Sequence, residues 1–214
     1  MKQILVYSDS LSWGLIPNTR QRLPLDERWP GVLENKLNTA ARRVRVIEDC
    51  LNARRTIWED PFKPGRNGLA GLAQRIEIHS PLELVILSLG TNDFQFCHPY
   101  SNAWSASQGI ATLVKEIRNA PIEPGMPTPS ILIVCPPPIR TPQGDMAAKF
   151  SGAEQRCIGL ADAYRAVATA MQCSFFDAGS VTSTSQVDGI HLDADQHLKL
   201  GNALAAVVSP LLSA

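Results

Sequence analysis

The sequence predicts an α/β fold, a three-layer α/β/α sandwich around a five-stranded parallel sheet of the flavodoxin-like type. Two observations predict it: short, almost continuously apolar runs alternate with amphipathic segments, and the crossovers between runs are long enough for helices. Apolar runs of this kind are typical of parallel strands covered on both faces, and the alternation favours a sandwich. With 214 residues the chain can bury a sizeable core, so we expect a single domain over 1–214.

Strand-like and helix-like segments follow one another along the chain. The apolar runs predict strands at Ile4–Tyr7, Val44–Ile47, Leu84–Leu89, Ile131–Cys135 and Ser174–Phe176. The amphipathic stretches predict helices over 30–41, 68–78, 103–119, 147–171 and 194–212. Segments rich in Pro, Arg, Asn or Gly predict long loops at 15–28, 53–66 and 136–146. Because long loops in a compact domain are often functional, these segments are candidates for the walls of a site.

The charge balance does not indicate a charged macromolecular partner. The chain has 20 basic and 20 acidic residues, so its formal net charge is zero and favours neither nucleic acid nor a membrane surface. No segment reaches the apolar length needed to cross a bilayer. The apolar run near the N-terminus is too short for a signal peptide. We therefore expect a cytoplasmic protein, unless a leader has been removed from a longer precursor.

Metal and cofactor chemistry has little support in the sequence. The cysteines form no CxxC pair, and their odd number fits buried thiols in a reducing compartment: Cys50, Cys97, Cys135, Cys157 and Cys173. His79, His98 and His197 are scattered and form no metal-binding pair. Phosphate-binding glycine loops are missing as well. We expect neither a metal nor a cofactor.

Residues with complementary chemistry follow the predicted strands. Ser10 follows the first strand, Asn92 follows the third, and Asp188 and His191 follow the fifth. Carboxyl ends of parallel strands meet at one edge of a sheet, so these side chains are expected to converge there. Acyl transfer requires a nucleophile, a base, a group that orients the base, and oxyanion donors. Each role has a candidate.

Each candidate also has a purely structural interpretation. Ser10 is a favoured helix N-cap residue, Asn92 lies in a typical turn sequence, and His191 can pack against the last helix. Any one motif is weak, but their occurrence together in this order favours a serine hydrolase. The non-enzyme alternative is a flavodoxin-like binding module. That alternative predicts that the Ser10 hydroxyl lies beyond hydrogen-bond reach of His191.

The same residues resemble the motif blocks of SGNH (GDSL) hydrolases. Residues 7–11 look like the GDSL block, 90–93 like the GxND block and 188–191 like the DxxH block. The resemblance runs from residue 4 to the C-terminal helix and is strongest to bacterial arylesterases with acyltransferase and perhydrolase activity. The shared features are Leu11-Ser12-Trp13-Gly14, Asp60-Pro61, Asn67-Gly68, Pro136-Pro137-Pro138 and the stretch 175–181.

The sequence departs from the family pattern at two glycine positions. Ser8 stands where the first block usually has Gly, which is tolerable if its backbone dihedrals are ordinary. Ala53 stands at the Gly whose backbone N–H usually points into the oxyanion hole. Because the donor is a backbone group, we expect Ala53 to serve if its φ is negative.

The residues and the resemblance together imply a mechanism. Ser10 is the expected nucleophile, His191 the general base and Asp188 the group that orients His191, while Asn92 and the N–H groups of Ser10 and Ala53 stabilise the oxyanion. The expected substrates are short-acyl, acetyl-type esters of aryl or alkyl alcohols, with possible acyl transfer or perhydrolysis. The alternative is a carbohydrate acetylesterase that uses loop arginines, namely Arg54, Arg55, Arg66 and Arg140.

Residues next to the catalytic candidates are expected to form the substrate site. An apolar wall is predicted from side chains that flank catalytic positions, with Asp9 beside them: Asp9, Leu11, Trp13, Phe94 and Ile190. Trp13 has an equal alternative as a helix–sheet packing residue. By resemblance we also expect a homo-oligomer, with loop 15–28 as a candidate contact.

Overall fold

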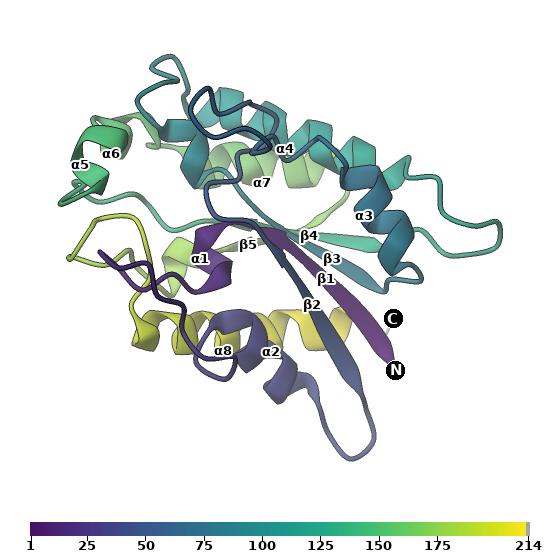
Figure 1. The fold of residues 1–214 in the computed structure, drawn as a ribbon. Helices are drawn as coiled ribbons and strands as arrows, with labels where there is room; N and C mark the ends of the chain where they lie inside the picture. Colours follow the sequence, from purple (N-terminus) through teal and green to yellow (C-terminus); the bar gives the residue numbers. More distant parts are fainter. Residues whose placement is uncertain (213–214) are drawn as a thin grey trace.

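The computed structural model describes residues 1–212 and has the predicted sheet between two layers of helices (Figure 1). All five strands are parallel, in the order β2-β1-β3-β4-β5. Their bounds are β1 Lys2–Ser8, β2 Val44–Cys50, β3 Leu84–Ser88, β4 Ser130–Cys135 and β5 Ser174–Asp177. The predicted fold class is therefore confirmed.

Helices cover both faces of the sheet, which explains why the central strands are apolar throughout. Figure 1 shows α3 (Leu72–His79), α4 (Ala103–Arg118) and α7 (Leu160–Ala170) on one face. The other face carries α2 (Trp29–Leu37) and α8 (Ala194–Leu211). Alternate residues of β1 enter the two cores: Leu5 and Tyr7 face the first layer, and Ile4 and Val6 face the second.

The single helix predicted over 147–171 is wrong. The segment forms α5 (Met146–Lys149), α6 (Ala153–Arg156) and then α7. Gly152 and Gly159 precede α6 and α7 with φ of 70° and 83°, a left-handed conformation that interrupts a helix. Because the helix is broken, α5 stays beside the loops at the carboxyl edge of the sheet (Figure 1).

Two other helices are shorter than predicted. The helix expected over 68–78 starts only at Leu72, because Gly71 has φ 76°. The helix expected over 30–41 ends at Leu37, where Asn38 leaves the helical conformation. The Asn38 side chain donates to the carbonyls of Glu34 and Val44 and accepts from the N–H of Val44. This side chain therefore ends α2 and connects it directly to β2.

Short helical turns and long loops occupy the edge where the strands end. They are α1 (Ser10–Trp13) after β1, and the 3₁₀ turns η1 (Thr91–Phe94) after β3 and η2 (Ala178–Ser180) after β5. Segments 15–28, 53–66 and 136–146 contain little regular structure, as predicted. Among residues 1–212, no helix is both long and apolar enough to cross a membrane.

Candidate active site

The turn from β1 into α1 presents Ser10 as the first residue of a helix. Asp9, not Ser10, is the N-cap: its Oδ1 accepts from the N–H of Leu11 at 2.9 Å. Gly14 ends the turn with φ 84°. The capping role proposed as the structural interpretation of Ser10 therefore belongs to its neighbour, and the Ser10 hydroxyl is available for another contact.

The serine that replaces the usual glycine of the first block ties two strands together. The Ser8 hydroxyl donates to the carbonyl of Ser88 at 2.6 Å, and its oxygen lies 2.5 Å from Oγ of Ser12. Ser8 is not among the non-glycine residues with positive φ, so its backbone is ordinary, as tolerance of serine requires. The hydroxyl thus fixes the end of β1 to β3, directly before Asp9.

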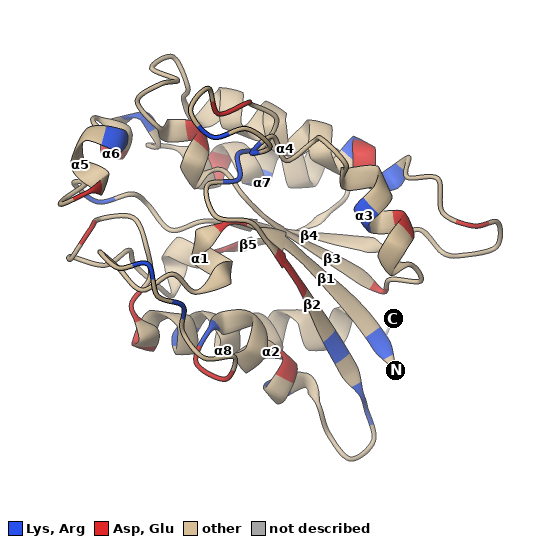
Figure 2. Cartoon of the chain, viewed as in Figure 1, with Lys and Arg blue, Asp and Glu red and all other residues tan. Residues whose placement is uncertain are grey.

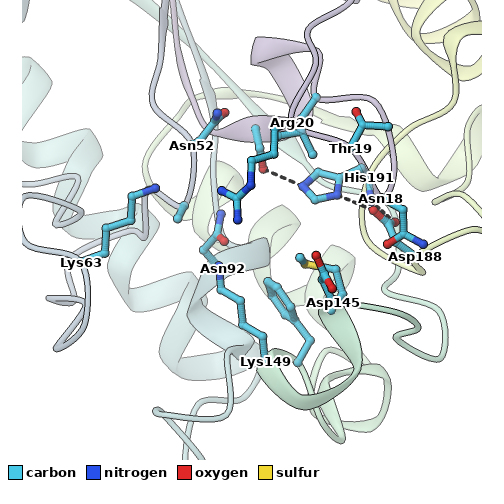
Figure 3. Close-up of a pocket in the computed structure, with 15 residues that line it drawn as sticks. Asn18, Thr19, Arg20, Asn52, Lys63, Asn92, Asp145, Lys149, Asp188 and His191 are labelled. Atoms are coloured by element: carbon cyan, nitrogen blue, oxygen red, sulfur yellow. Dashed lines mark hydrogen bonds and ion pairs between the residues drawn. The ribbon is translucent and has the colours of Figure 1, made fainter.

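His191 and Asp188 lie on one loop and form a hydrogen-bonded chain with Ser10 (Figure 3). Nε2 of His191 is 3.1 Å from Ser10 Oγ, and Nδ1 of His191 is 2.6 Å from Oδ2 of Asp188. The other oxygen of Asp188 accepts from the N–H groups of Ile190 and His191, both at 2.9 Å. The Ser10–His191 contact contradicts the binding module, which predicted no such contact.

Gly189 allows this loop to pack against the segment after β4. Its φ is 78°, and a Cβ added there would stand 2.5 Å from the carbonyl oxygen of Thr141. Two backbone hydrogen bonds join the loops: Arg140 donates to Gly189, and Gln143 donates to Asp188, both at 3.0 Å. Segment 136–146 therefore braces the loop that carries Asp188 and His191.

Electrostatics keep Asp188 ionised although it is buried. Burial by itself raises the pKa of this carboxyl, but the hydrogen bond and charge of His191, together with the backbone donors, lower that pKa below its ordinary value. An ionised Asp188 that accepts from Nδ1 leaves Nε2 of His191 as the nitrogen facing the Ser10 hydroxyl. That tautomer is the one a general base requires.

Asn92 faces Ser10 from η1, and buried hydrogen bonds define the orientation of its amide. Its Nδ2 donates to Oδ2 of Asp9 at 2.9 Å, and its Oδ1 accepts from Nε2 of Gln95 at 2.8 Å. Gln95 in turn accepts from Arg55 at 2.8 Å, and Arg55 pairs with Asp60 at 3.4 Å. A side-chain amide nitrogen has two hydrogens, so one remains for a substrate oxyanion.

Asp9 positions its neighbours, and its expected role in substrate binding is wrong. The side chain is 2% exposed, and its two oxygens accept from Leu11 and Asn92. Burial raises its pKa to about 6, against the lowering effect of these donors and of His191. Asp9 therefore connects the nucleophile turn to the oxyanion donor.

Ala53 adopts a backbone conformation that the sequence analysis did not expect. Its φ is +67°, whereas its use as a donor was conditional on a negative φ. Within residues 1–212, neither the N–H of Ala53 nor that of Ser10 donates to another group, and both residues line the same cavity. The left-handed backbone usual for glycine is thus kept by alanine, at a cost of roughly 1–2 kcal/mol.

The cavity above Ser10 has a volume of about 810 Å³, and its lining mixes polar and apolar residues. Three of the expected wall residues, Leu11, Phe94 and Ile190, are instead buried in the core between sheet and helices. Trp13 packs beneath the Arg22 guanidinium, 4.8 Å from its ring centroid. The apolar wall was a wrong prediction, because loop residues and the short helix α5 with its caps supply the rest of the lining: Leu15, Asn18, Thr19, Arg20, Asn52, Lys63, Asp145, Met146, Lys149 and Phe150.

Two of the loop arginines expected to bind sugar are structural. Arg54 is 4% exposed; it donates to the carbonyls of Ser8 and Asp49 and pairs with the Asp49 carboxylate at 2.7 Å. Arg55 is fully buried in the network behind Asn92. Both side chains anchor the loop after β2 and do not line the cavity.

Comparisons with known proteins agree with this geometry. The model of the GDSL-like lipase/acylhydrolase family matches residues 9–202. The inhibitor-bound aryl esterase of Mycobacterium smegmatis is 38% identical, with a TM-score of 0.92 over 99% of this chain and 100% of that one. A carbohydrate acetylesterase family member from Sinorhizobium meliloti is 36% identical, with a TM-score of 0.93 and full coverage of both chains. Est24, a carbohydrate acetylesterase from the same organism, is 33% identical, with a TM-score of 0.92 over 99% of this chain and 100% of that one.

No curated protein matches the chain. The family match covers most of the sequence, and the similar structures cover nearly all of it. The chain therefore belongs to the GDSL-like lipase/acylhydrolase family of SGNH hydrolases and is a carboxylic ester hydrolase.

Proposed function

We propose that the protein hydrolyses short-acyl, acetyl-type esters of aryl or alkyl alcohols through an acyl-enzyme. The observation that carries the proposal is the chain of hydrogen bonds from Ser10 through His191 to Asp188, with Asn92 on the opposite side of the nucleophile. The cavity supports the short-acyl preference, because its apolar lining residues, Leu15, Ala53, Met146 and Phe150, are interspersed with polar and charged ones.

Acylation begins when Ser10 Oγ attacks the ester carbonyl and His191 Nε2 takes the hydroxyl proton. Asp188 stabilises the imidazolium through Nδ1. The oxyanion receives hydrogen bonds from the N–H groups of Ser10 and Ala53 and from the free hydrogen of Asn92. His191 then returns the proton to the departing alcohol, which leaves an acyl-serine.

Deacylation repeats these steps with water. His191 removes a proton from water as the oxygen attacks the acyl carbonyl, and when the intermediate collapses to release the carboxylic acid, His191 gives that proton to Ser10 Oγ. Acyl transfer to an alcohol or to peroxide would follow the same path with a different acceptor, and it stays a prediction. Homo-oligomer formation through loop 15–28 also stays a prediction.

Initial rates on p-nitrophenyl acetate, butyrate and octanoate test the proposal. We expect turnover to fall steeply with chain length, and the Ser10→Ala variant to lose about 10⁴-fold or more of kcat with an unchanged circular dichroism spectrum. Wild-type rates in Ser10→Ala on every ester would reject the nucleophile.

A carbohydrate acetylesterase is the second candidate, and one atom of the cavity favours it. Oδ1 of Asn52 is buried without a hydrogen-bond partner in the described structure, beside a lining that also contains Asn18, Thr19 and Asp145. A sugar hydroxyl would supply the missing donor. Acetate release from acetylated xylo-oligosaccharides, compared with phenyl acetate, measures this preference. In that case Asn52→Ala would weaken sugar-ester turnover more than phenyl acetate turnover.

A further inference from the structure

Three cationic side chains at the cavity form no ion pair in the part of the chain that the structure describes. The side chains of Arg20, Lys63 and Lys149 line the cavity, and within residues 1–212 their charged groups form neither an ion pair nor a hydrogen bond. Figure 3 shows the three side chains extending into the cavity toward the region of Asn92. The Lys149 ammonium lies 5.7 Å from the centroid of the Phe150 ring.

Three other arginines at the same edge of the sheet do form ion pairs with carboxylates. Arg22 pairs with Glu48, Arg54 with Asp49 and Arg55 with Asp60. Figure 2 shows Lys and Arg in the loop after α1, in the loop after β2 and around α5 and α6, although the whole chain has no net charge. The three unpaired cations come from these separate segments and meet only at the cavity.

Two acidic residues also line the cavity and do not neutralise the three cations. Asp188 is held by His191, and Asp145 forms no ion pair within the described part of the chain. Burial lowers the pKa of Lys149, the charge of Asp60 opposes that effect, and the positive charge of Lys63 adds to it. Burial and the charge of Arg66 lower the pKa of Lys63, and Asp60 again opposes them. Asp60 forms its ion pair with Arg55, so the three cations gather at the cavity without an ion pair of their own among the described residues, an arrangement that favours an anionic ligand.

We propose that the preferred ester carries a negative charge, a carboxylate on its alcohol or acyl part, which Arg20, Lys63 and Lys149 bind while Ser10 attacks the ester carbonyl. The proposal rests on the proposed esterase function and specifies its substrate class. A planar carboxylate matches the guanidinium fork of Arg20, and the two ammonium groups serve as point charges. The three cations lie on the exposed part of the cavity, so they select charged substrates without taking part in the reaction at Ser10.

Two matched substrate pairs test the proposal and locate the charge. The first compares 4-acetoxybenzoate with neutral 4-acetoxybenzamide, so the carboxylate is on the alcohol part. The second compares mono-p-nitrophenyl succinate with neutral p-nitrophenyl 4-oxopentanoate, so the carboxylate is on the acyl part. We expect only the pair whose carboxylate is on the part of the ester bound by the three cations to respond. In that pair, the ratio of anionic to neutral kcat/KM should fall about tenfold in the triple variant Arg20→Gln, Lys63→Met, Lys149→Met. The same ratio should fall about threefold in Lys63→Met alone.

Intrinsic ester reactivity cancels, because each ratio is compared between proteins on the same two substrates. Lys36→Met removes the same charge from α2, outside the cavity lining, and should leave both ratios unchanged. Raising the salt from low concentration to 0.5 M should lower the wild-type ratio in the same pair. If the triple variant still hydrolyses the neutral esters and both of its ratios equal those of wild type, the proposal is wrong. Absence of Ser10-dependent turnover on all four esters instead rejects the proposed function.

Discussion

The cavity around Ser10 has a buried side and an exposed side that are built differently. On the buried side, Asn92 lines the cavity and is held by hydrogen bonds to Asp9 and Gln95. On the exposed side, loop residues such as Arg20 and Lys63 line the same cavity, and their charges form no ion pair in the described structure. The nucleophile therefore lies in a cavity with a hydrogen-bonded, buried part and an exposed, cationic part.

The difference separates the chemistry from the choice of substrate. Buried polar groups are expensive to leave unpaired, so the Asn92 side is defined by its partners and suits a donor that must be in place before reaction. Exposed cations are less constrained by neighbouring groups, and each contributes little free energy to an ion pair. They therefore suit discrimination between esters. Substitutions on the two sides should consequently change different kinetic constants.

The largest expected effect is on the buried side. Asn92→Ala removes one oxyanion donor, and we expect kcat to fall by about 10²- to 10³-fold with little change in KM. Steady-state kinetics on p-nitrophenyl acetate measures both constants. The matched control is Asn52→Ala, the same change at another asparagine of the cavity lining, for which we expect less than about a tenfold fall in kcat. Equal losses of kcat in the two variants would erase the proposed distinction.

A second prediction concerns Asp93, a fully buried acid on the same side. Burial raises its pKa to about 7, although its carboxylate accepts from the N–H and hydroxyl of Thr56. Since the folded-state pKa lies above the ordinary value, Asp93 destabilises the folded protein increasingly as pH rises toward 7. The free energy of unfolding of Asp93→Asn minus that of wild type should therefore rise by about 2 kcal/mol from pH 5 to pH 7, as measured by urea denaturation.

Comparing the variant with wild type isolates this contribution. Burial lowers the pKa of His197 to about 3, so this residue has the opposite pH dependence, but it is present in both proteins and cancels in the difference. Asp145→Asn, the same substitution at an exposed position, is the matched control. Stability curves that remain parallel for Asp93→Asn and wild type would contradict the prediction.

The same division explains what could be predicted from the sequence. The five strands and the convergence of Ser10, Asn92, Asp188 and His191 follow from apolar runs and from residues placed directly after them. The helix expected over 147–171 failed because Gly152 and Gly159 adopt left-handed conformations that periodicity does not reveal. The prediction of the cavity lining failed for a related reason: its residues come from loops and from the short helix α5, whose mutual packing leaves no local pattern.

Loop composition nonetheless contained a usable signal. Segments 15–28, 53–66 and 136–146 were predicted to be functional loops, and they contribute Arg20, Lys63 and Asp145 to the cavity. The residues next to the catalytic motifs were the poorer guide, because Leu11, Phe94 and Ile190 point into the core. In this chain, proximity in sequence to a catalytic residue indicates packing more often than substrate contact.

The smallest expected effect is at Ala53, which also lines the cavity. Its φ of +67° is costly for alanine, and glycine removes that strain while increasing the entropy of the unfolded chain. We expect Ala53→Gly to raise the free energy of unfolding by at most about 1 kcal/mol, with kcat within a few-fold of wild type because the donor is a backbone N–H. Gln172→Gly, at φ 52° and outside the cavity lining, should gain similar stability with unchanged kcat. If Ala53→Gly instead lost stability while Gln172→Gly gained it, packing of the alanine methyl group rather than strain would dominate at this position.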